Sequence, residues 1–283
     1  MKSSTRPFAA LFLIHSVLLL YTFLRKRDRK TLLALLLSNM GFSYLFEYIV
    51  LNIFHGYKYK PRVIRKNYLD NIFGAVFSQG VIIPFTALFL TAFKVKWKIR
   101  TFFILYFYLV ENLFIKMGIY KVHWWRPLFT VMSLPVLFQL SDRWHKLLKK
   151  GIPSVQFITL FLTNLVTRVN LLFLLALRGK IRFGRGLFHS WKEHFIAAPL
   201  YAIVLELFSA WSLRRGDWVS IVRTLLFNVS LDIYLFKTGT VSKKFVWPWF
   251  SFILHIVMIF FSTLYQKLIY TGIKSEVETD GGS

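Results

Sequence analysis

Residues 101–127, TFFILYFYLVENLFIKMGIYKVHWWRP, decide the fold class of this chain. An apolar run fills residues 101–115 and contains a single carboxylate, Glu111; Lys116 and a shelf of aromatic and basic residues follow it. A helix of a water-soluble protein would show a polar face at a period near 3.6 residues, and this run shows almost none. We interpret it as a membrane helix that turns its acid toward other protein and reaches the headgroup level with its Trp, Tyr and Lys side chains.

The composition of the whole chain indicates a membrane protein. Of its 283 residues, 56% are hydrophobic and 19% aromatic, and the mean hydropathy is +0.53, whereas a soluble domain has about 45–50% apolar residues. The net charge of +25 comes from Lys and Arg in short loops, which favours contact with anionic lipid headgroups over binding of nucleic acid. Cysteine is absent from the sequence, which excludes disulfides, thiolate metal sites and Cys nucleophiles.

The apolar residues form nine segments, most of them long enough to cross a bilayer. Each segment is continuous, without the alternation of a strand, so the sequence predicts an all-α fold: a polytopic transmembrane helical bundle of about nine spans, with eight or ten as alternatives. The first segment runs straight into RKRDRK and lacks a small-residue cleavage site, which predicts a retained helix rather than a cleaved signal peptide. Loops on both faces are basic, so the orientation of the termini stays open. The segments are residues 8–24, 31–54, 69–93, 101–115, 128–140, 154–177, 195–213, 219–236 and 245–270.

A faint internal repeat appears when the sequence is shifted by about 121 residues. The pattern acid-x4-Lys-x-Gly-x8-Pro-x-Phe then occurs twice, which predicts one leading helix followed by two four-helix halves. Halves with an even number of helices would be parallel, and chance similarity between aromatic membrane sequences is the alternative. The coinciding pairs are Trp97 and Trp218, Glu111 and Asp232, Lys116 and Lys237, Gly118 and Gly239, Pro127 and Pro248, and Phe129 and Phe250.

This repeat suggests a division of the chain. Residues 1–30 would be the first transmembrane helix with its basic loop, residues 31–150 the first helical half and residues 151–272 the second. Residues 273–283 read as a disordered acidic tail, whose terminal GGS fits part of a linker.

Ionisable residues within the apolar segments are the main candidates for a site. A charged side chain in a bilayer faces protein or water and has a partner, so the sequence predicts a buried polar cluster that binds a substrate or ion. The alternative is a set of ion pairs that only lock the bundle, for instance Arg168 with Glu47 or Glu111. Residues one helical turn away add polar neighbours, and His255 is the deeply placed histidine that we expect to have a partner. The candidates are Glu47, Glu111, Arg168, Glu206, Asp232, Tyr44, Tyr108, Asn164 and His255.

The interfacial loops supply a second set of candidates. Aromatic and basic residues alternate there, as expected of side chains that bind anionic headgroups. The candidates are Lys58, Lys60, Arg62, Trp124, Trp125 and Arg126. Asp70, at the start of the third segment, is predicted to cap its own helix.

The histidines do not form a zinc motif. His189 and His194 are five residues apart, not the four that place two ligands on one helix face, and we interpret residues 187–194 as a short interfacial helix. The sequence predicts no metal site and no cofactor.

The runs YLFEYIVLNIFHGYKYKP and YLDNIFGAVFSQGVIIP resemble uncharacterised multi-pass membrane proteins of spore-forming Gram-positive bacteria. The resemblance covers the first half of the chain. It rests on Glu47, Tyr57, Pro61, Asp70, Asn71, Gln79 and Pro84. It implies no activity and favours a bacterial cytoplasmic or spore inner membrane, with a role in sporulation as an expectation.

Three functions fit these observations. The first is an integral membrane protein of transport or binding type, or a subunit of a membrane complex, with a polar site inside the bundle. The second is an enzyme that acts on lipid headgroups, with His123 or His194 as the base. The third is a structural or assembly protein whose buried charges only pair. Expected partners are anionic membrane lipids and a protein partner or second copy, and no nucleic acid.

Overall fold

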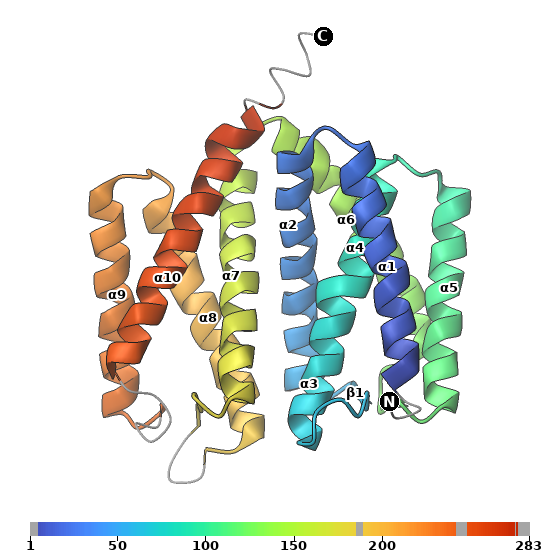
Figure 1. Ribbon diagram of the computed structural model, residues 1–283, viewed down its shortest axis with the longest axis horizontal. Coiled ribbons are helices and arrows are strands. Elements are labelled where there is room, and N and C mark those ends of the chain that lie inside the picture. The colour runs from blue at the N-terminus through green and yellow to red at the C-terminus, as the bar shows by residue number, and fades with distance from the viewer. Residues whose placement is uncertain (1–4, 185–188, 242–247, 275, 277–283) are drawn as a thin grey trace. The chain divides into compact units, whose positions relative to one another are not determined.

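In the computed structural model, described for residues 5–184, 189–241, 248–274 and 276, the chain is helical almost throughout (Figure 1). The chain divides into two compact units, Met1–Lys150 and Gly151–Ser283. The described residues contain nine continuous helical segments, so the predicted all-α class is confirmed. Most of the acidic tail predicted at residues 273–283 lies outside the described residues.

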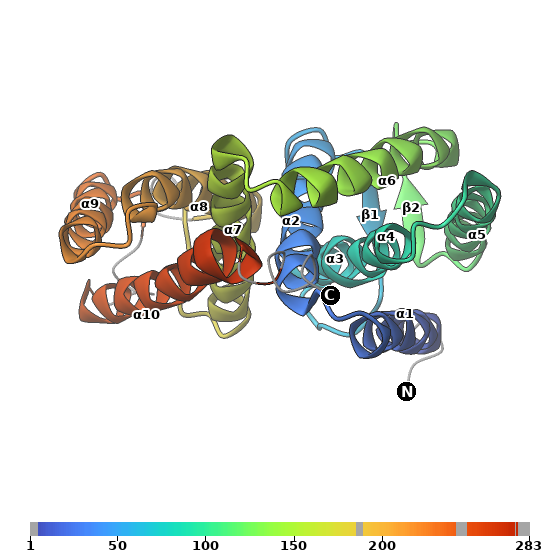
Figure 2. The same cartoon turned by 90° about the horizontal axis from the view of Figure 1, so that it is seen from above.

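The first unit is built around one long interrupted helix. This helix consists of α3 (Asn67–Phe77), a π-helical turn η2 (Ser78–Ile82) and α4 (Ile83–Ala92). It lies between α1 (Thr5–Arg25) and α6 (Pro127–Lys149), as Figure 2 shows. The remaining members of the unit are α2 (Arg29–Glu47), its π-helical extension η1 (Tyr48–Ile53) and α5 (Trp97–Lys116). Helix α2 packs on both α4 and α6, and α5 packs on α6.

A two-stranded ladder, which the sequence did not predict, closes one end of the first unit. Strands β1 (Tyr57–Tyr59) and β2 (Tyr120–Val122) are antiparallel, with Tyr59 opposite Tyr120. Strand β1 packs against α3, which requires a residue without a side chain at Gly74: a Cβ there would lie 2.4 Å from the Cβ of Tyr59. Since successive strand residues face opposite sides, the ladder turns its tyrosines inward and its lysines outward.

The described residues of the second unit form four helices. These are α7 (Pro153–Leu177), α8 (Trp191–Leu213), α9 (Trp218–Lys237) and α10 (Pro248–Lys267), the last extended by the π-helical turn η3 (Leu268–Gly272). Helix α8 packs on α7 and α9, and α10 packs on all three. Helix α8 begins at a capping box in which Ser190 and Glu193 bind each other's backbone N–H groups. The predicted short helix at 187–194 is therefore wrong: residues 185–188 lie outside the described part, and His194 belongs to the first turn of α8.

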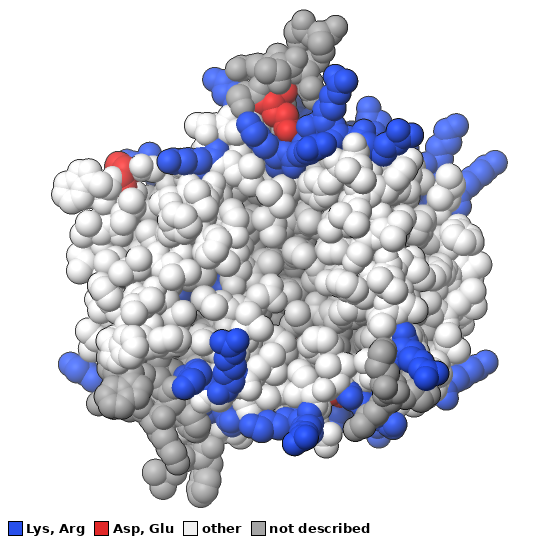
Figure 3. All heavy atoms as spheres, viewed as in Figure 1, with Lys and Arg blue, Asp and Glu red and all other residues white. Residues whose placement is uncertain are grey.

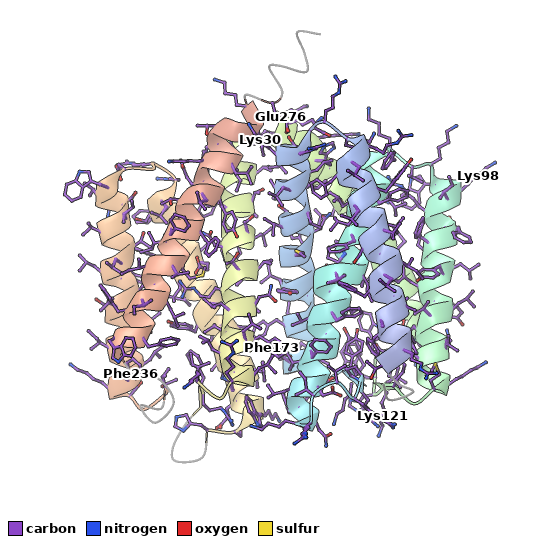
Figure 4. The ribbon with its side chains drawn as sticks, in the orientation of Figure 1. Lys30, Lys98, Lys121, Phe173, Phe236 and Glu276 are labelled. Atoms are coloured by element: carbon purple, nitrogen blue, oxygen red, sulfur yellow. The ribbon has the colours of Figure 1, made fainter. Side chains whose placement is uncertain are left out.

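Seven of the helical segments are long and apolar enough to cross a membrane, which makes the protein an integral, multi-pass membrane protein. Helices α5 and α6 are also long enough, at 20 and 23 residues, but they carry more charge than the other seven. Figure 3 shows Lys and Arg gathered at the helix ends, with a band between them that is almost free of charge. In the first unit, Lys30 and Lys98 lie at one end and Lys121 at the other (Figure 4). Both ends are therefore basic, as the loop sequences predicted.

Candidate functional site

Glu47 is a buried carboxylate at the end of α2, near the β1–β2 ladder. Its side chain accepts a hydrogen bond from the Tyr57 hydroxyl, and Gln79 Nε2 donates to the same oxygen, Oε2, at 3.2 Å. Glu47 is 6% exposed, and its other oxygen, Oε1, has no hydrogen-bond partner among the described residues. A buried polar atom normally has a partner, and Oε1 lacks one.

Three tyrosines of the ladder pack against one another beside Glu47. The ring centroids of Tyr57, Tyr59 and Tyr120 lie 5.0–5.5 Å apart. Burial raises the pKa of all three phenols well above the usual value, and the Glu47 charge raises it further. The phenols therefore stay protonated; Tyr57 donates to Glu47, and the Tyr120 hydroxyl interacts with Glu111.

Glu111, on α5, is the second carboxylate at this end of the unit. The hydroxyl groups of Thr130 and Tyr120 interact with it, and Thr130 in turn accepts a hydrogen bond from Trp125 Nε1 at 3.1 Å. Glu111 Oε1 is buried and has no partner within the described part of the chain. Two carboxylates from different helices thus each keep one free acceptor oxygen.

Glu111 and the three tyrosines line a cavity of about 420 Å³ inside the first unit, and Glu47 contacts its wall through Tyr57 and Gln79. Its walls come from α1, α2, η2, α5, α6 and the ladder, and they are mainly apolar. The three tyrosines, Trp125 and Glu111 lie at the ladder end, whereas Leu137 and Leu140 continue the wall along α6 away from it. The volume lies in the range of small-molecule sites, roughly 300–1,000 Å³. The cavity therefore combines a polar, aromatic end with an apolar chamber.

The π-helical turn η2 explains how polar groups reach this cavity. Ser78 and Gln79 lie in η2 and line the wall, because a π turn rotates the side chains that follow it away from α-helical positions. Gly80 lies in the same turn, where the helix packs closely on Tyr44: a Cβ on Gly80 would lie 2.7 Å from the Tyr44 hydroxyl oxygen.

The second unit has its own buried carboxylate, Asp232, whose oxygens are fully engaged. Tyr201 donates to Oδ1 at 2.6 Å, Ser251 donates to Oδ2, and His255 Nε2 lies 2.8 Å from Oδ2. His255 is 1% exposed, so the expectation that it is deeply placed with a partner is confirmed. Ser251 and His255 both contact the acid rather than each other, so the group is not arranged as a Ser–His–Asp catalytic triad.

A buried ion pair joins Arg168 of α7 to Glu206 of α8. The suggested pairing of Arg168 with Glu47 or Glu111 is therefore wrong; the four candidate acids in apolar segments were equally available on sequence grounds. Asn164, one turn from Arg168, donates to Ser262 at 2.8 Å. Within the second unit, the predicted polar residues thus mostly bind one another across helices, as structural pairs do.

The two tyrosines predicted beside the acids differ in their surroundings. Tyr44 lies against Gly80 inside the first unit. Tyr108 is 37% exposed and is not among the cavity residues. The contribution of Tyr108 to the site is not supported by this geometry.

The predicted headgroup residues also separate. Arg62, Trp124 and Arg126 are exposed, and Lys58 and Lys60 are partly exposed, as a headgroup contact requires. Trp125 is instead 8% exposed and forms part of the cavity wall.

Asp70 does not cap its own helix. It accepts hydrogen bonds from the backbone N–H groups of Arg62, Val63 and Ile64 at 2.8–2.9 Å, so it fixes the loop that follows β1. The predicted capping of α3 by Asp70 is therefore wrong, because the N–H groups that donate to Asp70 lie in the loop before α3.

The two histidines proposed as enzyme bases have ordinary structural contacts. His194 Nδ1 accepts from the Phe183 N–H, and His123 Nδ1 lies 2.8 Å from the His55 carbonyl oxygen.

No protein-family model matches the chain, and neither a curated protein nor a solved structure matches it. The function of the protein is therefore inferred from the geometry of the site itself.

Proposed function

We propose that this membrane protein is of the binding type and that the cavity of its first unit holds a small amphiphilic molecule. The observation that carries this proposal is the free acceptor oxygen Glu111 Oε1 at the polar end of a mainly apolar cavity. A ligand with a donor group at one end and an apolar body would satisfy both regions. Transport of such a molecule is a further step that this proposal does not require.

We also propose that the chain consists of a leading helix, α1, and two copies of one four-helix unit. Helix α7 begins 124 residues after α2, and α8 begins 124 residues after α3; α9 begins 121 residues after α5, and α10 begins 121 residues after α6. The change from 124 to 121 arises within one helix, because α3, η2 and α4 together span 67–92 whereas α8 spans 191–213. Helix pairs in contact correspond as well, since α2 packs on α4 and α6 as α7 packs on α8 and α10.

The setting is proposed to be a bacterial cytoplasmic or spore inner membrane, on the basis of the resemblance described above. Anionic lipids are the proposed surface partners, and the exposed side chains of Arg62 and Arg126 support this. Association with a second copy or another membrane protein stays a prediction.

The binding proposal is tested with two water-soluble probes, 1-octanol and n-octylamine. Each is titrated into the protein in nanodiscs of zwitterionic lipid, and bound probe is measured by calorimetry. Leu137→Trp places a larger side chain in the cavity wall and should abolish binding of both probes. Met132→Trp is the matched control, because Met132 lies on the same helix but is 62% exposed. Equal binding by all three proteins, or binding by none, would refute the proposal.

A further inference from the structure

The acids Glu111 and Asp232 occupy equivalent places in the two units. Each is followed by Lys five residues later, and α5 and α9 begin and end 121 residues apart. The same interval separates Thr130 from Ser251, the hydroxyl residues that contact the two acids from the next helix. The acid and its hydroxyl neighbour are therefore a shared feature of both units.

The two carboxylates differ in their hydrogen-bond partners. Asp232 contacts the His255 ring, whereas the residue 121 positions before His255 is Leu134, an apolar side chain of the cavity wall. Glu111 therefore lacks the nitrogen partner that Asp232 has, and its Oε1 is without a partner in the described residues. The position of the His255 ring in the second unit thus corresponds to an apolar residue of the cavity wall in the first.

Helix packing differs between the two units. In the second unit α8 and α9 pack directly, and Phe208 stacks on Phe227 with ring centroids 3.9 Å apart. In the first unit α4 is not among the main packing partners of α5 within the described chain, and the cavity lies between η2 and α5. Where α8 and α9 pack closely in the second unit, the corresponding helices of the first unit thus leave a cavity beside Glu111.

We infer that the cavity binds an organic cation that carries at least one N–H group and an apolar chain, with its nitrogen placed at Glu111 as the His255 ring is placed at Asp232. This inference rests on the proposed function and specifies the ligand class. The tyrosine faces at the same end suit a cation, because an aromatic ring attracts positive charge in a desolvated site.

The test compares octylamine, which is a cation with N–H groups at pH 7, with 1-octanol, octyltrimethylammonium and octanoate. In the nanodisc titration, wild-type protein should bind octylamine about tenfold to a hundredfold more tightly than octanol, as expected for hydrogen bonds to a charged group. Octyltrimethylammonium, which lacks N–H, should bind more weakly than octylamine, and octanoate should bind least. Glu111→Gln should remove the preference for octylamine while octanol binding is retained.

Leu134→His tests the equivalence directly. It places a histidine beside Glu111 at the position equivalent to His255, which contacts Asp232. This variant should lower octylamine affinity at least about tenfold. Leu140→His, also in the cavity wall on α6 but away from the acid, is the matched control and should have a smaller effect. If Leu134→His does not fold, the Glu111→Gln comparison decides.

The outcomes separate the two proposals. If octanol and octylamine bind equally, and Leu137→Trp lowers the binding of both equally, the cation inference is overturned and the binding proposal stays intact. Absence of cavity binding by all four probes would overturn both.

Discussion

Removing one partner of the Arg168–Glu206 pair should destabilise the second unit far more than removing both. The side chains are 4% and 1% exposed, so Glu206→Gln leaves a guanidinium buried without a counter-charge. Loss of one partner of a buried pair costs about 3–5 kcal/mol. The double variant Arg168→Met and Glu206→Met removes both charges and fills a similar volume, so its free energy of unfolding should lie within about 1 kcal/mol of wild type or above it.

The assay is unfolding by sodium dodecyl sulfate in dodecylmaltoside micelles, followed by far-ultraviolet circular dichroism. Lys149→Met is the control, because Lys149 pairs with Asp28 at 2.8 Å but is 37% exposed; it should cost less than about 1 kcal/mol. Octylamine binding by the first unit should persist in the double variant. A double variant as unstable as the sum of its single variants would refute the argument that these residues serve only to neutralise each other.

Three further predictions follow from the first unit. Hydrogen bonds from His145 and Lys149 lower the pKa of Asp28, so Asp28→Asn should cost about 1 kcal/mol of unfolding free energy above pH about 4, the ordinary range for Asp. Chemical unfolding across pH should show that the difference between wild type and variant disappears as pH falls through the folded pKa of Asp28. A difference that stays constant with pH would contradict this. Asp70→Ala leaves three backbone N–H groups without their carboxylate and should speed trypsin cleavage at residues 62–66 at least about tenfold, since losing such bonds costs about 2 kcal/mol; unchanged cleavage would count against the loop-fixing role. Gly74→Ala should displace Tyr59 and lower octylamine affinity while circular dichroism shows the helices retained; unaltered affinity would show that β1 does not shape the site.

The helices could be predicted from the sequence because membrane helices are specified locally by long apolar runs. Helix ends that carry charged residues were harder to predict. For example, α5 begins at Trp97 and includes Lys98 and Arg100, whereas the apolar run starts at residue 101. The β1–β2 ladder could not be predicted, since three-residue strands pair across some 60 intervening positions. Its only trace in the sequence is the alternation Tyr-Lys-Tyr at 57–59, which equally fits an interfacial aromatic belt.

The site was predictable only in part. Glu47 and Glu111 stand out because a carboxylate in an apolar run needs a reason. Their surroundings depend on tertiary contacts: Tyr120 lies beside Tyr59 of β1 and reaches Glu111 from the ladder, and Gln79 reaches Glu47 from the π turn. Ion-pair partners were likewise undetermined, since helix contacts decide which acid meets Arg168.

The central claim is that a cationic nitrogen belongs at Glu111 inside the first unit. The most direct measurement is a diffraction experiment on crystals soaked with octylamine that carries bromine at the far end of its chain, with anomalous data collected at the bromine edge. We predict one strong bromine peak in the apolar part of the cavity, near Leu137 and Leu140, with the nitrogen within hydrogen-bonding distance of Glu111. Bromine found only against the outer, lipid-facing surface of the helices, with the cavity empty, would contradict the claim.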